Sequence, residues 1–405
     1  MTTGPAMSVT WLTPSDPDEH RERVRSAFVT AFGAEPDGVW SAPGRVNVVG
    51  EHTDYNGGLC LPVALPHTTA VAASATSGRL VLHSLQSGSD PFEGELADVA
   101  PGTPDGWPAY VAGVPWALAQ QGLDACGLQA VIDGEVPLGA GLSSSAALES
   151  ATALAVDALA GLDLAGDDAG RTRLAAACVQ AENDVAGAPT GGMDQAASLR
   201  CTAGHALLLD CRDFTVRQVP FDPAAHGLAL LVIDTQAPHR LVDGQYAERR
   251  RSCEAAARTL GVETLREVVG RPLDDLLGRL DDDVLVRRTR HVVTEIARVQ
   301  ELVDLLDQGR LPEIGPVLDA SHTSMRDDFE ISSPELDVAV EAARSAGALG
   351  ARMTGGGFGG SAIALVPRER LDDVAGRVHA AFADAGMDAP RFLVAEPGPG
   401  AVRWA

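Results

Sequence analysis

The pattern of apolar and polar positions in the first half of the chain predicts strands and helices in an irregular order. Apolar residues three and four positions apart predict a helix at 20–32, which Gly33 ends. β-branched and alternating stretches predict strands at 39–50, 68–75, 79–85 and 128–133. Helical spacing returns at 109–121 and in an Ala- and Leu-rich segment that follows a Gly/Ser loop at 137–145.

The second half begins with strand-like segments and then becomes rich in helices. Strands are expected at 205–210 and 228–235, helices from 245 to 326, and a further helix at 332–337, where a Ser cap precedes a Pro in the first turn. A Gly-rich turn joins two short strands near Arg352 and Ile363. This mixed order favours an α+β fold over a doubly wound sheet.

Length and composition indicate a two-domain protein that acts on small molecules. A chain of 405 residues can form two domains, and we expect 1–210 and 211–405, docked around a cleft. Apolar runs stay well short of the roughly 20 residues that span a bilayer, and the start of the chain has no basic segment before an apolar block. We therefore expect a cytoplasmic protein with no membrane partner. The net charge of −25 argues against nucleic acid as a partner.

Two residue types restrict the chemistry further. The six cysteines are scattered without a CxxC pair, which suggests neither a zinc site nor a disulfide framework. All 31 basic residues are Arg, because the chain contains no Lys. Schiff-base chemistry, the Walker A lysine and the strand lysine of protein kinases are therefore excluded. Phosphate, if bound, must be held by Arg, backbone N–H groups, helix N-termini and a metal.

The segment 137-PLGAGLSSSAALE-149 has the composition of an anion-binding loop. Gly139 and Gly141 allow positive φ or close backbone approach, and Ser143, Ser144 and Ser145 supply hydroxyls where an Ala-rich helix begins. The unpaired N–H groups of that helix start would attract an anion. A loop that merely caps its helix is the alternative, because most such caps bind nothing.

The second glycine cluster is 353-MTGGGFGGSAIALVP-367. Gly355, Gly357 and Gly360 match GxGxxG, but the dinucleotide fingerprint must open a helix, whereas the segment that follows is predicted to be a strand ending in Pro. The cluster is either a plain turn between two strands or a loop that lies against phosphate or sugar.

Two carboxylates and one Arg are the candidates for catalysis. Glu182 falls in the last turn of a predicted helix, and Asp194 follows a Pro/Gly turn, although carboxylates near helix ends often only cap the helix. A half-buried Asp194 would need a cation beside it to stay ionised, and Arg45 is the natural partner.

Arg45 belongs to 44-GRVNVVGEHTDYNGG-58, where polar and apolar residues are interleaved. Val46, Val48 and Val49 can enter a core while Arg45 and Asn47 share the other face, and His52 and Asp54 share a face if the chain is extended. A metal site there lacks an evident third ligand. Carboxylate, imidazole and guanidinium groups together suit the paired hydroxyls of a sugar.

These segments resemble galactokinases, within the superfamily of galacto-, homoserine-, mevalonate- and phosphomevalonate kinases. The signature GRVNVVGEHTDYNGGLCLP and the motifs PLGAGLSSSAALE and TGGGFGGSAI carry the resemblance, which extends from about residue 28 to 366. It implies a two-domain superfamily kinase fold, with mixed β-sheets, helices packed on them and the active site in the inter-domain cleft. It also implies transfer of the γ-phosphoryl group of ATP to the anomeric hydroxyl of α-D-galactose, as the first phosphorylation of galactose metabolism.

The resemblance further implies a role for each candidate residue. Asp194 would be the catalytic base, with Arg45 beside it. Galactose would contact Arg45, Glu51, His52, Asp54, Gly192, Asp194 and Tyr246. ATP would contact Trp107, Tyr110, Gly139, Gly141, Leu142, Ser143, Ser144 and Ser145. Mg²⁺ would be held by Ser145 and Glu182.

Two other functions compete with this prediction. A related kinase for N-acetylgalactosamine or arabinose would share all three motifs and differ in the pocket around the 2-hydroxyl. A catalytically silent sensor of galactose and ATP would keep the fold, although the presence of Arg45, Glu182 and Asp194 argues against it. The sequence leaves a monomer and a weak oligomer both open.

Overall fold

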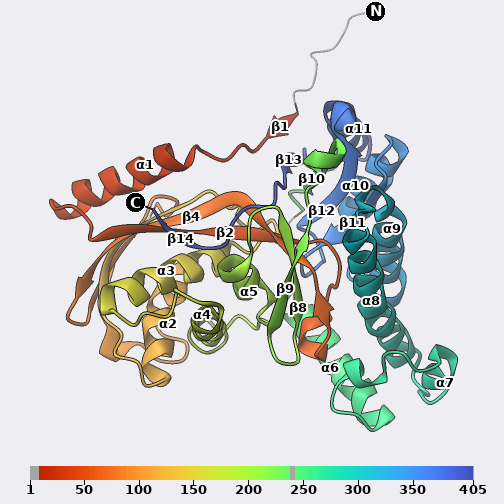
Figure 1. Ribbon diagram of the computed structural model, residues 1–405, viewed down its shortest axis with the longest axis horizontal. Helices are drawn as coiled ribbons and strands as arrows, with labels where there is room; N and C mark the ends of the chain where they lie inside the picture. The colour runs from red at the N-terminus through yellow and green to blue at the C-terminus, as the bar shows by residue number, and fades with distance from the viewer. Residues whose placement is uncertain (1–8, 89, 238–241, 405) are drawn as a thin grey trace, which may run out of the picture.

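The computed structural model describes residues 9–88, 90–237 and 242–404, which form three β-sheets with helices packed around them (Figure 1). The sheets have six, five and three strands. Most neighbouring strands are antiparallel, while β5–β7 and β1–β13 are parallel. The α+β fold with mixed sheets expected from the sequence is therefore confirmed.

The six-stranded sheet has the order β14-β2-β4-β7-β5-β6. Its strands are β2 (Gly38–Asn47), β4 (Pro62–Thr76), β5 (Arg79–Ser84), β6 (Phe92–Glu95), β7 (Gly127–Gly134) and β14 (Val402–Trp404). Helix α1 (Pro17–Phe32) covers one face, and α2 (Trp107–Gln120), α3 (Ser144–Ala160), α4 (Asp168–Gln180) and α5 (Met193–Arg200) lie on the other side (Figure 1). Covering both faces explains why most residues of β2 and β4 are buried, whichever side of the sheet they face.

The five-stranded sheet has the order β1-β13-β10-β12-β11. It contains β1 (Thr10–Trp11), β10 (Leu228–Asp234), β11 (Gly350–Thr354), β12 (Ser361–Pro367) and β13 (Arg391–Val394). All seven residues of the central strand β10 are buried. β11 and β12 form an antiparallel hairpin, so the glycine cluster at 355–360 joins two strands, as its flanking residues predicted.

A small antiparallel sheet and the later helices complete the molecule. β3 (Leu59–Cys60), β8 (His205–Asp210) and β9 (Thr215–Pro220) form the sheet. The helices are α6 (Val242–Leu260), α7 (Leu273–Leu277), α8 (Asp283–Asp307), α9 (Gly315–Ser324), α10 (Pro334–Ser345) and α11 (Leu371–Asp384). At α10 the Ser333 side chain accepts a hydrogen bond from the Leu336 N–H, with Pro334 in the first turn, as predicted.

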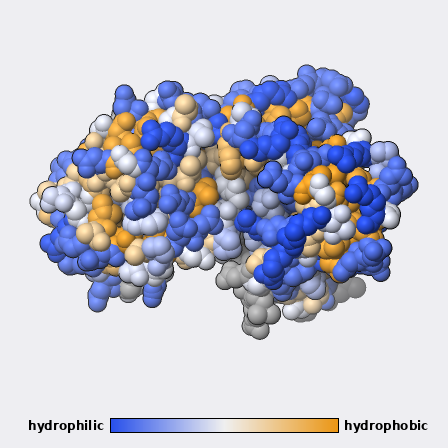
Figure 2. All heavy atoms as spheres, turned by 90° about the horizontal axis from the view of Figure 1, so that it is seen from below, coloured by the Kyte–Doolittle hydropathy of each residue, from blue (hydrophilic) through white to orange (hydrophobic). Residues whose placement is uncertain are grey.

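The two ends of the chain cross between the larger sheets. β1 pairs with β13 in the five-stranded sheet, and β14 pairs with β2 in the six-stranded sheet. The space-filling view has two lobes with a notch between them, and hydrophilic side chains predominate on both lobes (Figure 2). The division at residue 210 stays a prediction. Over the described ranges, no helix combines the length and apolar character needed to cross a membrane.

Candidate active site

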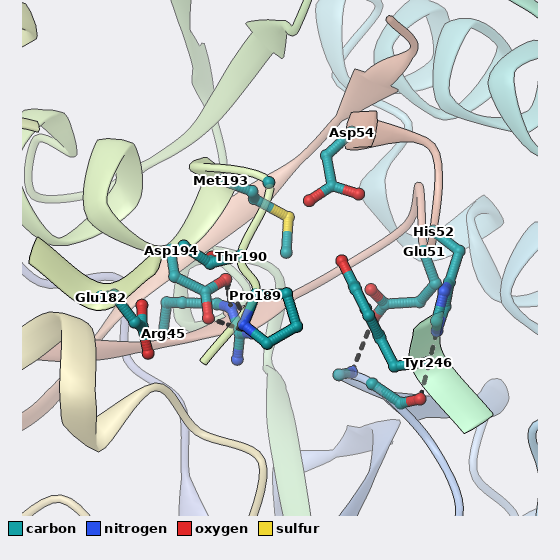
Figure 3. A pocket seen from close by; sticks show the side chains of 13 residues that line it. Arg45, Glu51, His52, Asp54, Glu182, Pro189, Thr190, Met193, Asp194 and Tyr246 are labelled. Atoms are coloured by element: carbon teal, nitrogen blue, oxygen red, sulfur yellow. Dashed lines mark hydrogen bonds and ion pairs between the residues drawn. The ribbon is translucent and has the colours of Figure 1, made fainter. Parts of the chain in front are cut away.

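A pocket of about 170 Å³ collects polar side chains from both halves of the chain (Figure 3). Its walls come from β2 and the turn after it, the segment 182–194, helix α6 and the glycine loop after β11. The residues that line it are Arg45, Glu51, His52, Asp54, Glu182, Pro189, Thr190, Gly191, Met193, Asp194, Tyr246, Gly355 and Gly356. Segments far apart in the sequence therefore meet at one polar cavity.

Arg45 and Asp194 form a bidentate ion pair at one end of this pocket. Arg45 Nε donates to Asp194 Oδ1 at 2.9 Å, and Arg45 Nη2 donates to Oδ2 at 2.8 Å. The Ser143 hydroxyl also donates to Asp194 Oδ2, at 2.5 Å. Charge-assisted, bidentate contacts of this kind fix geometry strongly. The partnership of Arg45 with Asp194 expected from the sequence is thus present.

The Gly/Ser segment does precede a helix, and its serines lie at the helix start. Ser143 adopts a left-handed conformation (φ 59°, ψ 47°) before the first turn of α3. Gly139 and Gly141 also have positive φ, of 72° and 71°, which glycine adopts without strain. Arg45 Nη1 donates to the Gly141 carbonyl at 2.7 Å. The N–H groups at the start of α3 therefore lie close to the Arg45–Asp194 pair.

The second glycine cluster, 355–360, approaches this loop closely. The Ser361 hydroxyl donates to the Ala140 carbonyl at 2.7 Å, and a side chain at Gly355 would lie 3.0 Å from the Gly141 oxygen. Gly355 and Gly356 also line the pocket. The cluster is thus a strand-to-strand turn that also borders the site.

The signature segment turns sharply at His52 instead of staying extended. His52 has φ 58°, and a 3₁₀ turn at Asp54–Asn56 follows it. The His52 ring contacts the Tyr55 hydroxyl at 2.8 Å and the Gly356 carbonyl at 3.1 Å. Burial lowers the pKa of His52 to about 3, so the ring is neutral. Val46, Val48 and Val49 are fully buried, as their pattern predicted.

Glu51 is held by protein groups on both of its carboxylate oxygens. Oε1 accepts from the Gly355 N–H at 2.8 Å and the Thr354 hydroxyl at 3.1 Å, and it lies 3.2 Å from Arg352 Nη2. Oε2 accepts from Asn47 Nδ2 at 2.9 Å. The carboxylate therefore connects the signature turn to the second glycine cluster in addition to lining the pocket.

Asp54 faces the pocket across from Asp194 (Figure 3). Burial, together with the negative charges of Asp194 and Glu51, raises the pKa of Asp54 to about 6. The backbone of Gly191 lies so close that a Cβ there would stand 1.9 Å from Asp54 Oδ2. Gly192, at φ 94°, precedes the first residue of α5 and so directs Asp194 into the pocket.

Glu182 lies on a π-helical turn, Ala181–Val185, that continues α4. Such turns widen a helix and are frequent at functional sites. Burial and the charge of Asp194 raise the pKa of Glu182 to about 7, while the Ser145 hydroxyl hydrogen bonds to the carboxylate. Gln195 Nε2 donates to Glu182 Oε2 at 2.5 Å and to Glu149 Oε2 at 3.0 Å. Burial also raises the pKa of Glu149 well above its usual range.

Tyr246 completes the pocket from helix α6. Its ring stands 5.2 Å from the His52 ring and 5.5 Å from the Tyr55 ring, and its hydroxyl is directed toward the centre of the pocket (Figure 3). Burial raises the pKa of Tyr246 well above its usual range, so the phenol keeps its proton.

A second pocket, of about 230 Å³, adjoins the start of α3. Trp107 and Ser144 line it, together with Gln86 and Leu148. Tyr110, one turn after Trp107, is half-buried and is not among the described residues that line this pocket. The Leu142 side chain is buried in the core, and its carbonyl accepts from the Arg45 N–H at 3.1 Å.

Several residues of the site carry no sequence signal that identified them. Gln195 and Glu149 sit on Ala-rich helices, where a polar residue is normally read as exposed. Gly191 and Gly356 lie in turns whose close contacts depend on distant segments. Within the described residues there is no cluster of three or more His, Cys, Asp or Glu arranged to hold a metal.

Comparison with known proteins gives matches along most of the chain. Residues 26–75 match the galactokinase galactose-binding signature, 109–201 the N-terminal domain of GHMP kinases and 302–384 their C-terminal domain. The chain is 52% identical to the galactokinase of Streptomyces coelicolor over 382 residues, which are 94% of this chain and 97% of that protein.

Solved structures agree with these matches. The crystal structure of Lactococcus lactis galactokinase complexed with galactose has a TM-score of 0.87 at 31% identity, and the match covers 94% of this chain and 98% of that one. The mevalonate kinase of Methanococcus jannaschii has a TM-score of 0.61 at 15% identity, covering 89% of this chain and 98% of that one. The second likeness is one of fold alone.

Proposed function

Because this chain belongs to the galactokinase family, we propose that it transfers the γ-phosphoryl group of ATP to the anomeric hydroxyl of galactose. The observation that carries this proposal is the meeting of Asp194, Arg45 and the N-terminal end of α3 at one end of a polar pocket. The pocket supplies acceptors for sugar hydroxyls and a base, and the helix end supplies donors for phosphate.

In this proposal the sugar lies between Asp54 and Asp194. Asp54, His52 and Tyr246 present one carboxylate, one neutral imidazole and one phenol to its hydroxyls. Gly191 leaves no room for a side chain beside Asp54, which keeps that carboxylate in place. Glu51 reaches the sugar from a position that protein contacts already fix.

Asp194 takes the proton of the anomeric hydroxyl as the phosphoryl group is transferred. Arg45 holds both oxygens of this carboxylate and so fixes its orientation toward the sugar. Phosphoryl transfer depends mainly on positioning and on neutralising the charge that spreads over the phosphoryl oxygens. The guanidinium of Arg45 lies close enough to the start of α3 to serve both purposes.

The nucleotide is proposed to lie across the start of α3. The phosphates would contact the N–H groups of residues 139–145, and the base would enter the second pocket beside Trp107. A helix N-terminus contributes about 0.3–2 kcal/mol to a bound anion. Enzymes lower barriers by roughly 8 kcal/mol or more. The helix alone is therefore insufficient. Positioning of the two substrates and the charge of Arg45 would supply much of the remainder, with a contribution from a metal when one is bound.

Ser145 and Glu182 fit a magnesium ion. Both offer oxygen ligands and they contact one another. The raised pKa values of Glu182 and of the nearby Glu149 indicate that burial makes their ionised forms unfavourable, and a dication would stabilise the ionised carboxylates. Mg²⁺ commonly uses one or two protein oxygens and completes its shell with water and phosphate. When bound, it would neutralise charge on the phosphates of ATP.

The cytoplasm is the proposed location. All six cysteines are free thiols in the structure, and five of them are buried. Unpaired thiols are typical of proteins from reducing compartments.

ADP release from the purified protein with Mg-ATP tests the proposed function. The sugars are galactose, glucose, N-acetylgalactosamine, arabinose and none. We expect galactose-dependent release of ADP, with galactose 1-phosphate as the product. Release with only another sugar of the panel would overturn the assignment of the substrate, and binding of galactose and ATP without release would identify a sensor.

A further inference from the structure

Helix α8 contacts the backbone of the signature turn through two side chains that do not line the pocket. His291 and Glu295 are one helical turn apart, so they share a face of α8. Glu295 Oε1 accepts from the Gly50 N–H at 3.0 Å and from the Glu51 N–H at 3.4 Å. His291 Nε2 is 3.1 Å from the Glu51 carbonyl oxygen. A carbonyl only accepts, so His291 Nε2 is the donor.

Helix α9 fixes both side chains from behind. The Ser321 hydroxyl donates to Glu295 Oε1 at 2.7 Å, and the Ser324 hydroxyl lies 3.0 Å from His291 Nδ1, which accepts because Nε2 carries the proton. Arg298 Nε donates to Glu295 Oε2 at 2.7 Å. His291 and Glu295 have no exposed surface. Two buried groups that both contact one peptide segment, and that are themselves hydrogen-bonded on their other side, form a rigid clamp.

The segment they hold needs such support. Gly50 has φ 101°, and His52 has φ 58°, a conformation that non-glycine residues adopt only where surrounding contacts impose it. Glu51 and His52, whose side chains line the pocket, lie directly beside the held peptide groups. A shift of this backbone would therefore move both side chains relative to the sugar.

Charge also favours an ionised Glu295. Arg298 and Arg352 hold the pKa of Glu295 well below its usual range despite complete burial. Arg352 also lies 3.2 Å from Glu51 Oε1, so one guanidinium links the clamp to a residue of the pocket. Burial lowers the pKa of His291 to about 4, which keeps the ring neutral and its Nε2 proton available to the Glu51 carbonyl.

We propose that His291 and Glu295 are positioning residues for galactose: from α8 they fix the Gly50–Glu51 backbone, and through it the side chains of Glu51 and His52. The inference rests on the proposed function, because it assigns to this pocket the binding of the sugar. Neither residue contacts the Gly/Ser loop at 137–145. We therefore expect the binding of ATP to be unchanged when either side chain is removed.

Kinetic constants of four variants test the clamp. Glu295→Ala removes the acceptor for the Gly50 N–H, whereas Glu295→Gln can keep an oxygen there. His291→Phe keeps a ring against Phe329, 4.4 Å away in the native protein, but lacks the donor. Glu301→Ala, at an exposed position of the same helix, is the matched control.

We expect KM for galactose to rise at least tenfold in Glu295→Ala and His291→Phe, because a displacement of about 1 Å at an active site can lower activity by up to about 100-fold. KM for ATP should stay within twofold in all four variants. Glu295→Gln should recover most of the galactose affinity. Thermal unfolding identifies any variant that does not fold. Ser321→Ala, which removes only one hydroxyl that supports Glu295, then replaces that variant, and we expect a smaller rise in KM for galactose.

The proposal would be overturned if Glu295→Ala and His291→Phe fold and their KM values for galactose stay within twofold of wild type. Equal increases in KM for galactose and ATP would also overturn it, since general loosening of the fold affects both substrates. Absence of galactose-dependent turnover in the wild-type protein would count against the proposed function instead. Calorimetric galactose binding to the same variants then decides the clamp, and equal affinities would reject it.

Discussion

Asp194 uses one carboxylate to contact both a guanidinium and the hydroxyl that precedes helix α3. Asparagine has nearly the same shape but cannot take a proton, and its amide would point N–H groups at Arg45. We expect Asp194→Asn to lower kcat by about 10²- to 10⁴-fold, the usual contribution of a general base. ATP affinity should change by no more than a few-fold.

ADP release and calorimetric titration with ATP measure these two effects. Asp184→Asn, an exposed carboxylate on the π-helical turn, is the control and should leave both unchanged. Turnover within a few-fold of wild type in Asp194→Asn would remove Asp194 from the chemical step.

Asp54 should make galactose binding depend on pH. Its pKa is raised to about 6, so the carboxylate is ionised above that pH and protonated below it. The ionised form accepts hydrogen bonds from sugar hydroxyls on both oxygens. Affinity should therefore be highest at pH 7 and above and should weaken several-fold between pH 6 and 5.

Calorimetry with galactose alone measures this dependence without contributions from ATP or metal. Asp54→Asn should bind galactose more weakly at pH 7 and should lose the change between pH 7 and 5. An unaltered pH profile in Asp54→Asn would assign the titration to another group.

At the scale of elements, long and strongly patterned segments were predictable and short ones were not. The sequence predicted β2, β4, β5, β7, β8 and β10, which are six or more residues long and contain several aliphatic residues, and also β11 and β12 on either side of the Gly-rich turn. It did not predict β6 or β9, in which exposed residues alternate with half-buried or buried ones. It also did not predict β1 and β14. Strands of two or three residues are defined by a distant partner, and that partner has no local signal.

The same distinction applies to the candidate site. Arg45 and Asp194 could be paired because a half-buried carboxylate requires a cation. The π-helical turn under Glu182 could not be foreseen, since a helix pattern does not indicate one widened turn. His291, Glu295 and Gln195 were missed because polar residues on helices are usually exposed, and only the packed structure reveals that these three are buried.

The turn that carries Gly191 should be intolerant of even a methyl group. A Cβ at this position would stand 1.9 Å from Asp54 Oδ2, so either the turn or Asp54 must move. We expect Gly191→Ala to raise KM for galactose about tenfold or more, with little change in KM for ATP.

Steady-state kinetics with each substrate varied in turn measures the effect. Gly376→Ala in α11, where a Cβ would meet no atom within 4 Å, is the control. That change should leave kinetics unaltered and stabilise the fold by about 0.5–1 kcal/mol. A galactose KM that Gly191→Ala leaves unchanged would show that Asp54 can move without cost to the sugar.

Over the whole molecule, the chain ends fasten elements that belong to opposite halves. The C-terminal segment reaches the last turn of α5, where the Ala401 N–H donates to the Ser198 carbonyl and the Gly400 N–H to the Cys201 carbonyl, both at 2.7 Å. α5 begins with Met193 and Asp194. The end of the chain thus supports the helix that presents Asp194 to the pocket.

Truncation after Pro397 should therefore reduce both stability and turnover. It removes β14, the two bonds to α5 and the packing of Trp404 beside His20. At about 1 kcal/mol for each hydrogen bond and more for the aromatic ring, the loss is on the order of 3–5 kcal/mol. We expect the thermal midpoint to fall by several degrees and kcat to fall at temperatures where the truncated protein is still folded.

Trp404→Ala should lower the midpoint by a smaller amount and leave kcat near wild type, because the bonds to α5 remain. If both variants lose stability without loss of kcat, α5 is held well enough by its other contacts, among them the bond from the Ser198 hydroxyl to the Pro43 carbonyl.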